Sequence, residues 1–346
     1  MTGFVSDLIL WYKENERELP WRITKDVYRI WVSEIILQQT RVNQGLSYYI
    51  NFLEQFPTVH HLANASEDTV LKCWEGLGYY SRARNMHHTA KYISQELNGT
   101  FPKSYDELLK LKGIGSYTAA AISSICYNEH RTVVDGNVFR VLTRIYGIET
   151  PINSAAGKKQ VEELAHALND GDDKGTFNQA LMEFGALQCK PKLPACASCI
   201  FNHYCWALKN KKVDLLPIKE KKIKIKHRYM FYFLIKDQHK QTIIQRRKHN
   251  DIWKGLYQFP LIETTKNISL KEVLASDDFE RLVNKQQASI TSETLLKHQL
   301  THQTLHLSIL SIQLNSIDHF SELEFQVIDV DKLSIYAFPK PLSNIN

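Results

Sequence analysis

The stretch "LLKLKGIGSYTAAAI", residues 108–122, decides how the first two thirds of the chain are interpreted. Gly113 and Gly115 flank an isoleucine, and an alanine-rich segment with helical composition follows them. Glycine allows positive φ and a close approach of the backbone, and the N–H groups that open a helix can bind one phosphate. Alone, this stretch predicts either a tight turn between two helices or a hairpin that binds a phosphate.

Two carboxylates on either side of this stretch stand in unusual positions. Asp135 in "VVDGNVFRVLTRIYG" precedes a predicted helix, where it could cap the helix, take part in chemistry, or do both. Glu34 in "YRIWVSEIILQQTRV" shares a helical face with Ile30, Trp31 and Leu37 and therefore interrupts an apolar stripe. Its head could reach solvent at the edge of the stripe, or burial could raise its pKa and keep it protonated as a general acid.

A short loop, "CKPKLPACASCIFNHYC" at residues 189–205, holds four of the six cysteines. Their spacing is C-x6-C-x2-C-x5-C, and they are Cys189, Cys196, Cys199 and Cys205. One C-x2-C pair is fewer than zinc ribbons use, so the spacing favours an iron–sulfur cluster, with zinc or no metal as the alternatives. No second redox centre or flavin motif accompanies the cysteines, so we expect a structural cluster that presents a basic loop.

Composition and texture divide the 346 residues into parts. The net charge of +6 fits a polyanionic partner, and no apolar stretch is long enough to span a membrane. Residues 4–210 show helical periodicity, whereas "HRYMFYFLIKD" and "QTIIQRRKH" alternate like strands and predict a strand-rich domain over 227–346. Between them, 209–228 holds nine Lys or Arg against two acidic residues, which predicts a solvated linker or one that lies near DNA phosphates.

The motifs "LPWR", "SEIILQQTRV", "GLGYYSRARN", "LKGIGSYTA", "VDGNVFRVL" and "FNQALMEFGA" precede the cysteine loop in this order. Together they resemble the MutY-type adenine DNA glycosylases of the helix–hairpin–helix superfamily, strongly over 5–210. The resemblance is weaker over 227–346, where "DIWKGLYQFP" is similar to the Nudix-like domain of that family.

The resemblance implies a mainly α N-terminal part, with a six-helix lobe and an iron–sulfur cluster lobe, followed by an α+β Nudix-like C-terminal domain. The implied boundaries are 1–22 plus 130–210 for the cluster lobe, 23–129 for the six-helix lobe with the hairpin, 211–226 for a basic linker, and 227–346 for a domain that recognises 8-oxoguanine.

The resemblance also implies a monofunctional base-excision-repair enzyme that flips out and hydrolyses adenine mispaired with 8-oxoguanine or guanine. The implied cofactor is a 4Fe-4S cluster and the implied partner is double-stranded DNA, bound by a monomer in the cytoplasm (at the nucleoid if the source is bacterial) and not at a membrane. Two alternatives are a related mismatch glycosylase acting on a pyrimidine and a non-catalytic iron–sulfur DNA-binding protein.

Site residues follow from the resemblance position by position. Glu34 matches the acid that protonates adenine, and Asp135 matches the carboxylate that stabilises the cationic sugar. Tyr117 and Asn137 match residues that position this centre. The residues that match adenine-pocket, duplex-gap and phosphate contacts are Arg17, Leu19, Trp21, Gln179, Gln39, Tyr79, Gly113 and Gly115.

The chain departs from its relatives at three places. A lysine that forms a Schiff base in lyase-competent relatives is replaced by Tyr117, so a monofunctional enzyme is expected. Leu300, Thr301 and His302 stand where many members have Phe-Ser-His, so Thr301 and His302 are the expected contacts to the oxidised base. The clustered glutamates of Nudix hydrolases are absent after "LYQFP", so pyrophosphatase activity is not expected.

Overall fold

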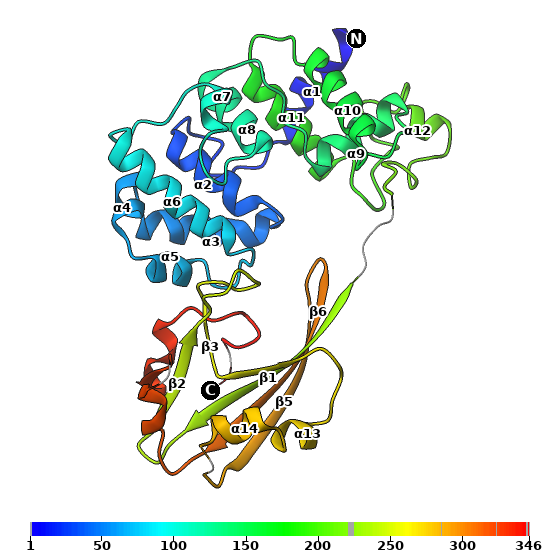
Figure 1. Ribbon diagram of the computed structural model, residues 1–346. Helices are drawn as coiled ribbons and strands as arrows, with labels where there is room; N and C mark the ends of the chain where they lie inside the picture. Colours follow the sequence, from blue (N-terminus) through cyan, green and yellow to red (C-terminus); the bar gives the residue numbers. More distant parts are fainter. Residues whose placement is uncertain (1, 221–224, 285, 323, 344, 346) are drawn as a thin grey trace. The chain divides into compact units, whose positions relative to one another are not determined.

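The computed structural model describes residues 2–220, 225–284, 286–322, 324–343 and 345 (Figure 1). By its internal contacts the chain divides into two compact units, Met1–Asn64 with Asn85–Lys221, and Ala65–Arg84 with Lys222–Asn346. Residues 221–224 belong to the expected linker 211–226 and lie outside the described residues. The division of the first unit into two lobes stays a prediction.

The first unit is built from helices, as the periodicity predicts. They are α1 (Thr2–Asn15), α2 (Val27–Leu37), α3 (Val42–Gln55), α4 (Val59–Asn64), most of α6 (Ser81–Glu96), α7 (Tyr105–Leu108), α8 (Ser116–Tyr127), α9 (Gly136–Tyr146), α10 (Ala155–Leu168), α11 (Lys174–Leu187) and α12 (Trp206–Lys209). Local signals set several ends, because Ser154 and Asp173 cap α10 and α11 through their side chains and Gly147 ends α9 with φ 72°.

Helices α1, α9, α10 and α11 enclose one hydrophobic core, which reaches into the cysteine loop. Phe201 of that loop is fully buried, stacks on Phe4 with centroids 4.7 Å apart, and lies 5.0 Å from the ring of Phe184. The loop is therefore held against the helices by the packing of Phe201.

The second unit contains a mixed seven-stranded sheet. Its strands are β1 (Lys226–Lys236), β2 (Gln241–Arg246), β3 (Tyr257–Gln258), β4 (Leu261–Thr264), β5 (Ser289–Gln299), β6 (Gln303–Gln313) and β7 (Gln326–Asp329). The main order is β3-β2-β1-β6-β5, with β4 paired to β1 and β7 to β2, and β1 runs parallel to β6. The two expected strand segments form β1 and β2, so the strand-rich prediction is confirmed.

Strand β1 is buried on both faces, as a central strand must be. Met230, Tyr232 and Leu234 point into one core, while Phe231 and Phe233 point into the other with the residues that follow in alternation. The second core is covered by α13 (Leu270–Leu274) and α14 (Asp277–Leu282), and the first by the chain around the 3-10 helix Val330–Ile335.

The segment 65–84, with α5 (Glu67–Cys73), belongs to this second unit, which the sequence did not indicate. Arg246 lies 2.8 Å from the Glu67 carboxylate, and the Tyr257 hydroxyl donates to Asp68 at 3.1 Å. The Phe338 N–H donates to Glu75 at 3.1 Å. These polar contacts fix the segment to the strands and loops of the C-terminal part. Among the described residues, no helix is long and apolar enough to cross a membrane.

We expect Phe201→Ala to lower the free energy of unfolding by about 3–5 kcal/mol, because it removes a fully buried ring from a packed aromatic group. Leu193→Ala in the same loop is the control, since Leu193 is 93% exposed and its loss should change stability by less than about 0.5 kcal/mol. Urea unfolding of both variants measures this difference, and equal stabilities would contradict the packing described.

Candidate functional site

Glu34 lies in the middle of α2 with only 7% of its surface exposed. Burial raises its pKa from 4.5 to about 7, the hydrogen bond donated by Tyr117 lowers it, and the charge of Asp135 raises it further. The Tyr117 hydroxyl also lies 3.5 Å from Met182 Sδ. The structure therefore brings together Glu34, Tyr117 and Asp135, three of the four residues expected to be catalytic, and gives Glu34 the pKa of an acid near neutrality.

Asp135 is the N-cap of α9, so the helix-capping role that the sequence allows is present. One of its oxygens accepts from the N–H groups of Asn137 and Val138, both at 2.8 Å, and the other from Asn137 Nδ2 at 2.7 Å. Burial raises the pKa of Asp135, while these hydrogen bonds and the nearby Arg140 oppose the rise. Arg140 in turn donates to Asn137 Oδ1 at 2.8 Å, which fixes the amide.

Close packing holds α9 in place behind this centre. A Cβ on Gly185 of α11 would lie 2.5 Å from Asn137 Cβ and 3.0 Å from its Cα, so only glycine fits there. On the other side, Gln38 donates to Thr118 at 3.1 Å and joins the end of α2 to α8. Glu34 and Asp135 come from helices that are fixed against their neighbours.

Arg17, one of the residues expected to line the adenine pocket, is held by Glu183 of α11, which the sequence motifs do not mark. Glu183 is 1% exposed and accepts from Arg17 Nε at 2.8 Å and Nη2 at 2.5 Å, and from Arg22 Nη1 at 2.8 Å and Nη2 at 2.6 Å. Burial raises the pKa of Glu183, but the hydrogen bonds from Arg22 and Arg17 prevail and lower it to about 2. Gln179, one helical turn earlier, accepts from the Tyr12 hydroxyl at 3.3 Å.

Leu19 and Trp21 of the same N-terminal segment are both 6% exposed, and the Trp21 ring meets Tyr49 edge-on at 5.0 Å. Leu19 can offer a purine only apolar contact, whereas Trp21 carries both an apolar ring and an indole N–H donor. Sequence could have indicated Glu183 only as an acidic residue inside an apolar helix, because its arginine partners lie more than 160 residues away.

The glycine hairpin lies between α7 and α8, as the sequence predicts. Gly113 has φ 83°, and a Cβ there would lie 2.6 Å from Asn85 Cβ. Gly115 is the N-cap of α8, and a Cβ at that position would meet nothing within 4 Å. The backbone at Gly115 therefore faces open space, where a phosphate could approach the first N–H groups of α8.

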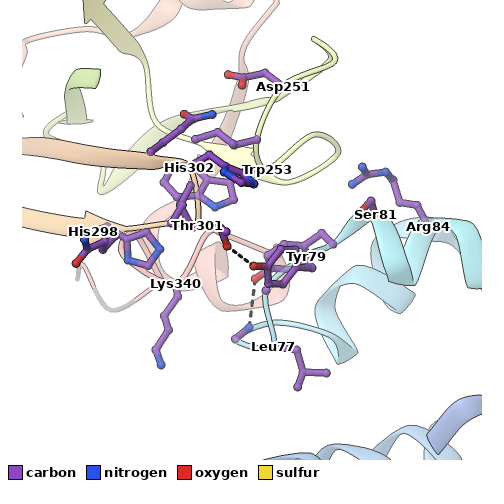
Figure 2. Close-up of a pocket in the computed structure, with 17 residues that line it drawn as sticks. Leu77, Tyr79, Ser81, Arg84, Asp251, Trp253, His298, Thr301, His302 and Lys340 are labelled. Atoms are coloured by element: carbon purple, nitrogen blue, oxygen red, sulfur yellow. Dashed lines mark hydrogen bonds between the residues drawn. The ribbon is translucent and has the colours of Figure 1, made fainter. Parts of the chain in front are cut away.

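Two further expected contacts have strained backbones. Gln39 follows α2 with φ 57° and is exposed, and Tyr79 has φ 48° and is 48% exposed. Tyr79 belongs to the second unit, where its hydroxyl lies 2.6 Å from Thr301 Oγ1 (Figure 2). Non-glycine residues at positive φ are uncommon and often mark functional sites.

Tyr79 and Thr301 line a cavity of about 470 Å³ within the second unit (Figure 2). Its wall comes from residues 76–81, from the loop at 251–253 and from the turn between β5 and β6, which contains Leu300 and His302. Arg84, Trp253 and Lys340 supply cations and an aromatic ring to the same wall. The cavity was not predicted, since its walls are separated by more than 150 residues of sequence.

The four cysteines of the 189–205 loop line one small cavity, together with Arg144. Arg144 Nη1 lies 3.4 Å from Cys189 Sγ, and burial raises the pKa of Cys199 to about 11. In the described part of the chain, no group of three or more His, Cys, Asp or Glu side chains is arranged to hold a single metal ion. Cys73 and Cys126, the other two cysteines, are partly buried and do not line this cavity.

The chain is similar in sequence to known protein families and to individual proteins. The family model of HhH-GPD superfamily base excision DNA repair proteins matches residues 32–170, and that of the NUDIX domain matches 231–345. The adenine DNA glycosylase of Buchnera aphidicola subsp. Baizongia pistaciae (strain Bp) is 35% identical and covers 99% of this chain and 95% of the relative. The adenine DNA glycosylase of Homo sapiens is 40% identical, over 60% of this chain and 40% of the relative.

Two solved structures resemble the N-terminal part. A thermostable thymine-DNA glycosylase has 28% identity and a TM-score of 0.56, and covers 60% of this chain and 96% of its own. Endonuclease III in a non-covalent DNA complex has 20% identity and a TM-score of 0.53, covers 61% and 95%, and shows the shared fold. The predicted fold class, a helix–hairpin–helix part followed by a Nudix-like α+β domain, is confirmed.

Replacing Glu34 should reveal its raised pKa in the stability of the protein. The folded protein holds this proton up to about pH 7, whereas the unfolded chain releases it near pH 4.5. Wild-type stability should therefore fall, relative to Glu34→Gln, as pH rises from 4.5 to 7, by a total of about 3 kcal/mol, and the difference should then stay constant. Urea unfolding of both proteins across this range measures it, and parallel curves would contradict the burial of the carboxyl.

Proposed function

This chain belongs to the adenine DNA glycosylases, a family of base-excision-repair enzymes that act on DNA, and we propose that it removes adenine mispaired with 8-oxoguanine or guanine. The observation that carries the proposal is the buried pair of carboxyls, Glu34 and Asp135, with Tyr117 hydrogen-bonded to Glu34. The target adenine is flipped out of the duplex, because the glycosidic bond is not accessible to protein side chains inside the stack.

In this proposal Glu34 is the general acid. Adenine leaves poorly as an anion, so protonation of its ring weakens the glycosidic bond. A carboxyl with a pKa of about 7 holds its proton near neutrality and can deliver it. The resulting Glu34 carboxylate then accepts a proton from the attacking water. The Tyr117 hydroxyl orients this carboxylate through its hydrogen bond.

Asp135 stabilises the positive charge that develops on the sugar. The transition state of glycoside cleavage resembles an oxocarbenium ion, and a fixed carboxylate beside it lowers the barrier. Asn137 holds this carboxylate through two hydrogen bonds, and Arg140 fixes the Asn137 amide, so little reorganisation is needed. Tyr117 has no amine, so no Schiff base forms and the enzyme is monofunctional.

Substrate binding is divided among several groups. Arg17 and Gln179 supply polar contacts to adenine, with Glu183 holding the arginine, while Leu19 and Trp21 contact the purine faces. Gly113 and Gly115 place backbone N–H groups against a DNA phosphate.

Other residues are assigned to the opposite base and to the gap that the flipped adenine leaves. Tyr79 and Gln39 fill the gap in the duplex, and Thr301 and His302 contact the oxidised base. The hydrogen bond between Tyr79 and Thr301 supports a shared role for these two residues. We also propose a monomer that works where the DNA is, in the cytoplasm or nucleoid.

Cys189, Cys196, Cys199 and Cys205 would hold a 4Fe-4S cluster. They fit it because all four line one cavity, and a cube takes one thiolate at each of four separate irons. When bound, the cluster supplies structure and charge to the 189–205 loop. The loop then presents Lys190 and Lys192 to DNA. Its other end is anchored by the buried side chain of Phe201.

A duplex assay tests the chemistry. With adenine opposite 8-oxoguanine, the wild type should release adenine and leave an intact abasic strand until alkali is added. Glu34→Gln should bind this duplex with near wild-type affinity and lose about 10³-fold in single-turnover rate, because it keeps the shape but cannot deliver a proton. Turnover by Glu34→Gln at the wild-type rate would refute the proposed acid.

Metal analysis tests the cysteine loop. We expect about four irons and four inorganic sulfides per chain, bound through the four thiolates of the loop. Cys199→Ser should lower the iron content and DNA binding together, whereas Cys73→Ser, a cysteine outside the loop, should leave both unchanged. Stoichiometric zinc without sulfide would contradict the cluster and favour the zinc alternative.

A further inference from the structure

Arg228 of β1 is a buried cation that the functional assignment does not use, with 8% of its surface exposed. Its guanidinium donates to both oxygens of Glu263, at 2.6 and 2.7 Å, and to both oxygens of Asp251, at 2.9 and 2.7 Å. A fifth contact joins Arg228 Nη1 to Gln303 Oε1 at 3.2 Å. Every side of the planar fork is therefore occupied by an acceptor.

Two of these three partners line the 470 Å³ cavity of the second unit. Asp251 belongs to the loop between β2 and β3, next to Trp253, and Gln303 opens β6 directly after Thr301 and His302. In Figure 2, Asp251 and Trp253 lie on the side of the cavity where Thr301 and His302 project. One guanidinium thus connects two segments of the cavity wall that are far apart in sequence.

This connection is rigid on the side of the loop. The hydrogen bonds to Glu263 are the main cause that raises the pKa of Arg228, so the cation stays charged despite its burial. Burial raises the pKa of Asp251, but the hydrogen bonds from Arg228 and from the Ile252 N–H, together with the charges of Arg228 and Arg247, outweigh it, so the pKa falls below its ordinary value. Arg247 adds a contact to Asp251 at 3.0 Å. The ionic part of the network is a fixed support for the neutral Gln303.

The turn between β5 and β6 is anchored through its backbone as well. The Leu300 N–H donates to the Gln303 carbonyl at 2.8 Å, and the Lys226 N–H donates to the His302 carbonyl at 3.0 Å. Backbone bonds fix the shape of the turn, and the Gln303 side chain joins it to the Arg228 network.

We propose that Arg228, acting through Gln303 and Asp251, positions the β5–β6 turn against the 251–253 loop and thereby sets the selectivity of the cavity for the base opposite adenine. Arg228 and Gln303 are positioning residues and need not touch the base. The inference rests on the proposed function, since it assigns opposite-base reading to Thr301 and His302. The proposed catalytic pair, Glu34 and Asp135, belongs to the other unit.

Gln303→Leu is the sharpest test, because it removes one neutral acceptor and leaves the ion pairs of Arg228 intact. Single-turnover adenine release is measured at saturating enzyme and at limiting enzyme, on duplexes with 8-oxoguanine and with guanine opposite adenine. The preference for 8-oxoguanine at limiting enzyme should fall about five- to tenfold, the effect of one lost positioning hydrogen bond. The saturated rate opposite 8-oxoguanine should stay at the wild-type value.

Two further variants control this result. Gln303→Glu keeps an acceptor for Arg228 and should retain the preference, since any added repulsion of DNA cancels in the ratio of the two duplexes. Gln313→Leu makes the same chemical change at the far end of β6 and should also retain it. The unfolding temperature of each variant shows whether the fold is intact.

A Gln303→Leu protein that folds normally and keeps the wild-type preference would overturn the inference and leave the proposed function standing. Loss of preference in Gln313→Leu as well would also overturn it, because the effect would then be a general one of the strand. A wild-type enzyme that released adenine equally well opposite both bases would contradict the proposed reading of 8-oxoguanine itself, and the inference with it.

Discussion

The carboxyl of Glu34 is buried in a helix, α2, whose neighbouring positions are almost all apolar. Removing an ionised carboxylate from water costs several kcal/mol, so such a group is either paired with a cation or stays protonated. Glu34 has no cation partner among the groups that shift its pKa, and its pKa rises to about 7 instead. The carboxyl of Glu34 therefore keeps its proton near neutral pH. Tyr117 of α8 and Asp135 at the start of α9 are the groups that act on it.

Helices α2, α8, α9 and α11 pack around this centre, and three different features position them. Gln38 joins α2 to α8, the cap at Asp135 begins α9, and the absence of a side chain at Gly185 lets α11 approach α9. A rigid pair of unlike carboxyls is what glycoside cleavage requires.

Features that depend on neighbouring residues could be predicted from the sequence. Glu34 was visible because it interrupts an apolar stripe, and Asp135 because it precedes a helix. The segments of β1 and β2 were expected to alternate, and they do form strands, although burial runs continuously along the middle of each. Glu183 was not visible, since its arginine partners are distant in sequence and an acidic residue in a helix is common. The membership of 65–84 in the second unit could not be predicted for the same reason. Arg246 and Tyr257 contact Glu67 and Asp68 across a large sequence separation that only the fold closes.

The protonation state of Glu34 is the claim on which the chemistry rests, and it can be observed directly. Carbon-13 NMR of glutamate labelled at the side-chain carboxyl, with Glu34→Gln to assign the resonance, follows the titration of this group in the folded protein. We expect a midpoint near pH 7 for Glu34, because burial disfavours its charged form. A midpoint near 4.5, the ordinary value, would contradict it, because the carboxyl would then hold no proton to give at neutral pH.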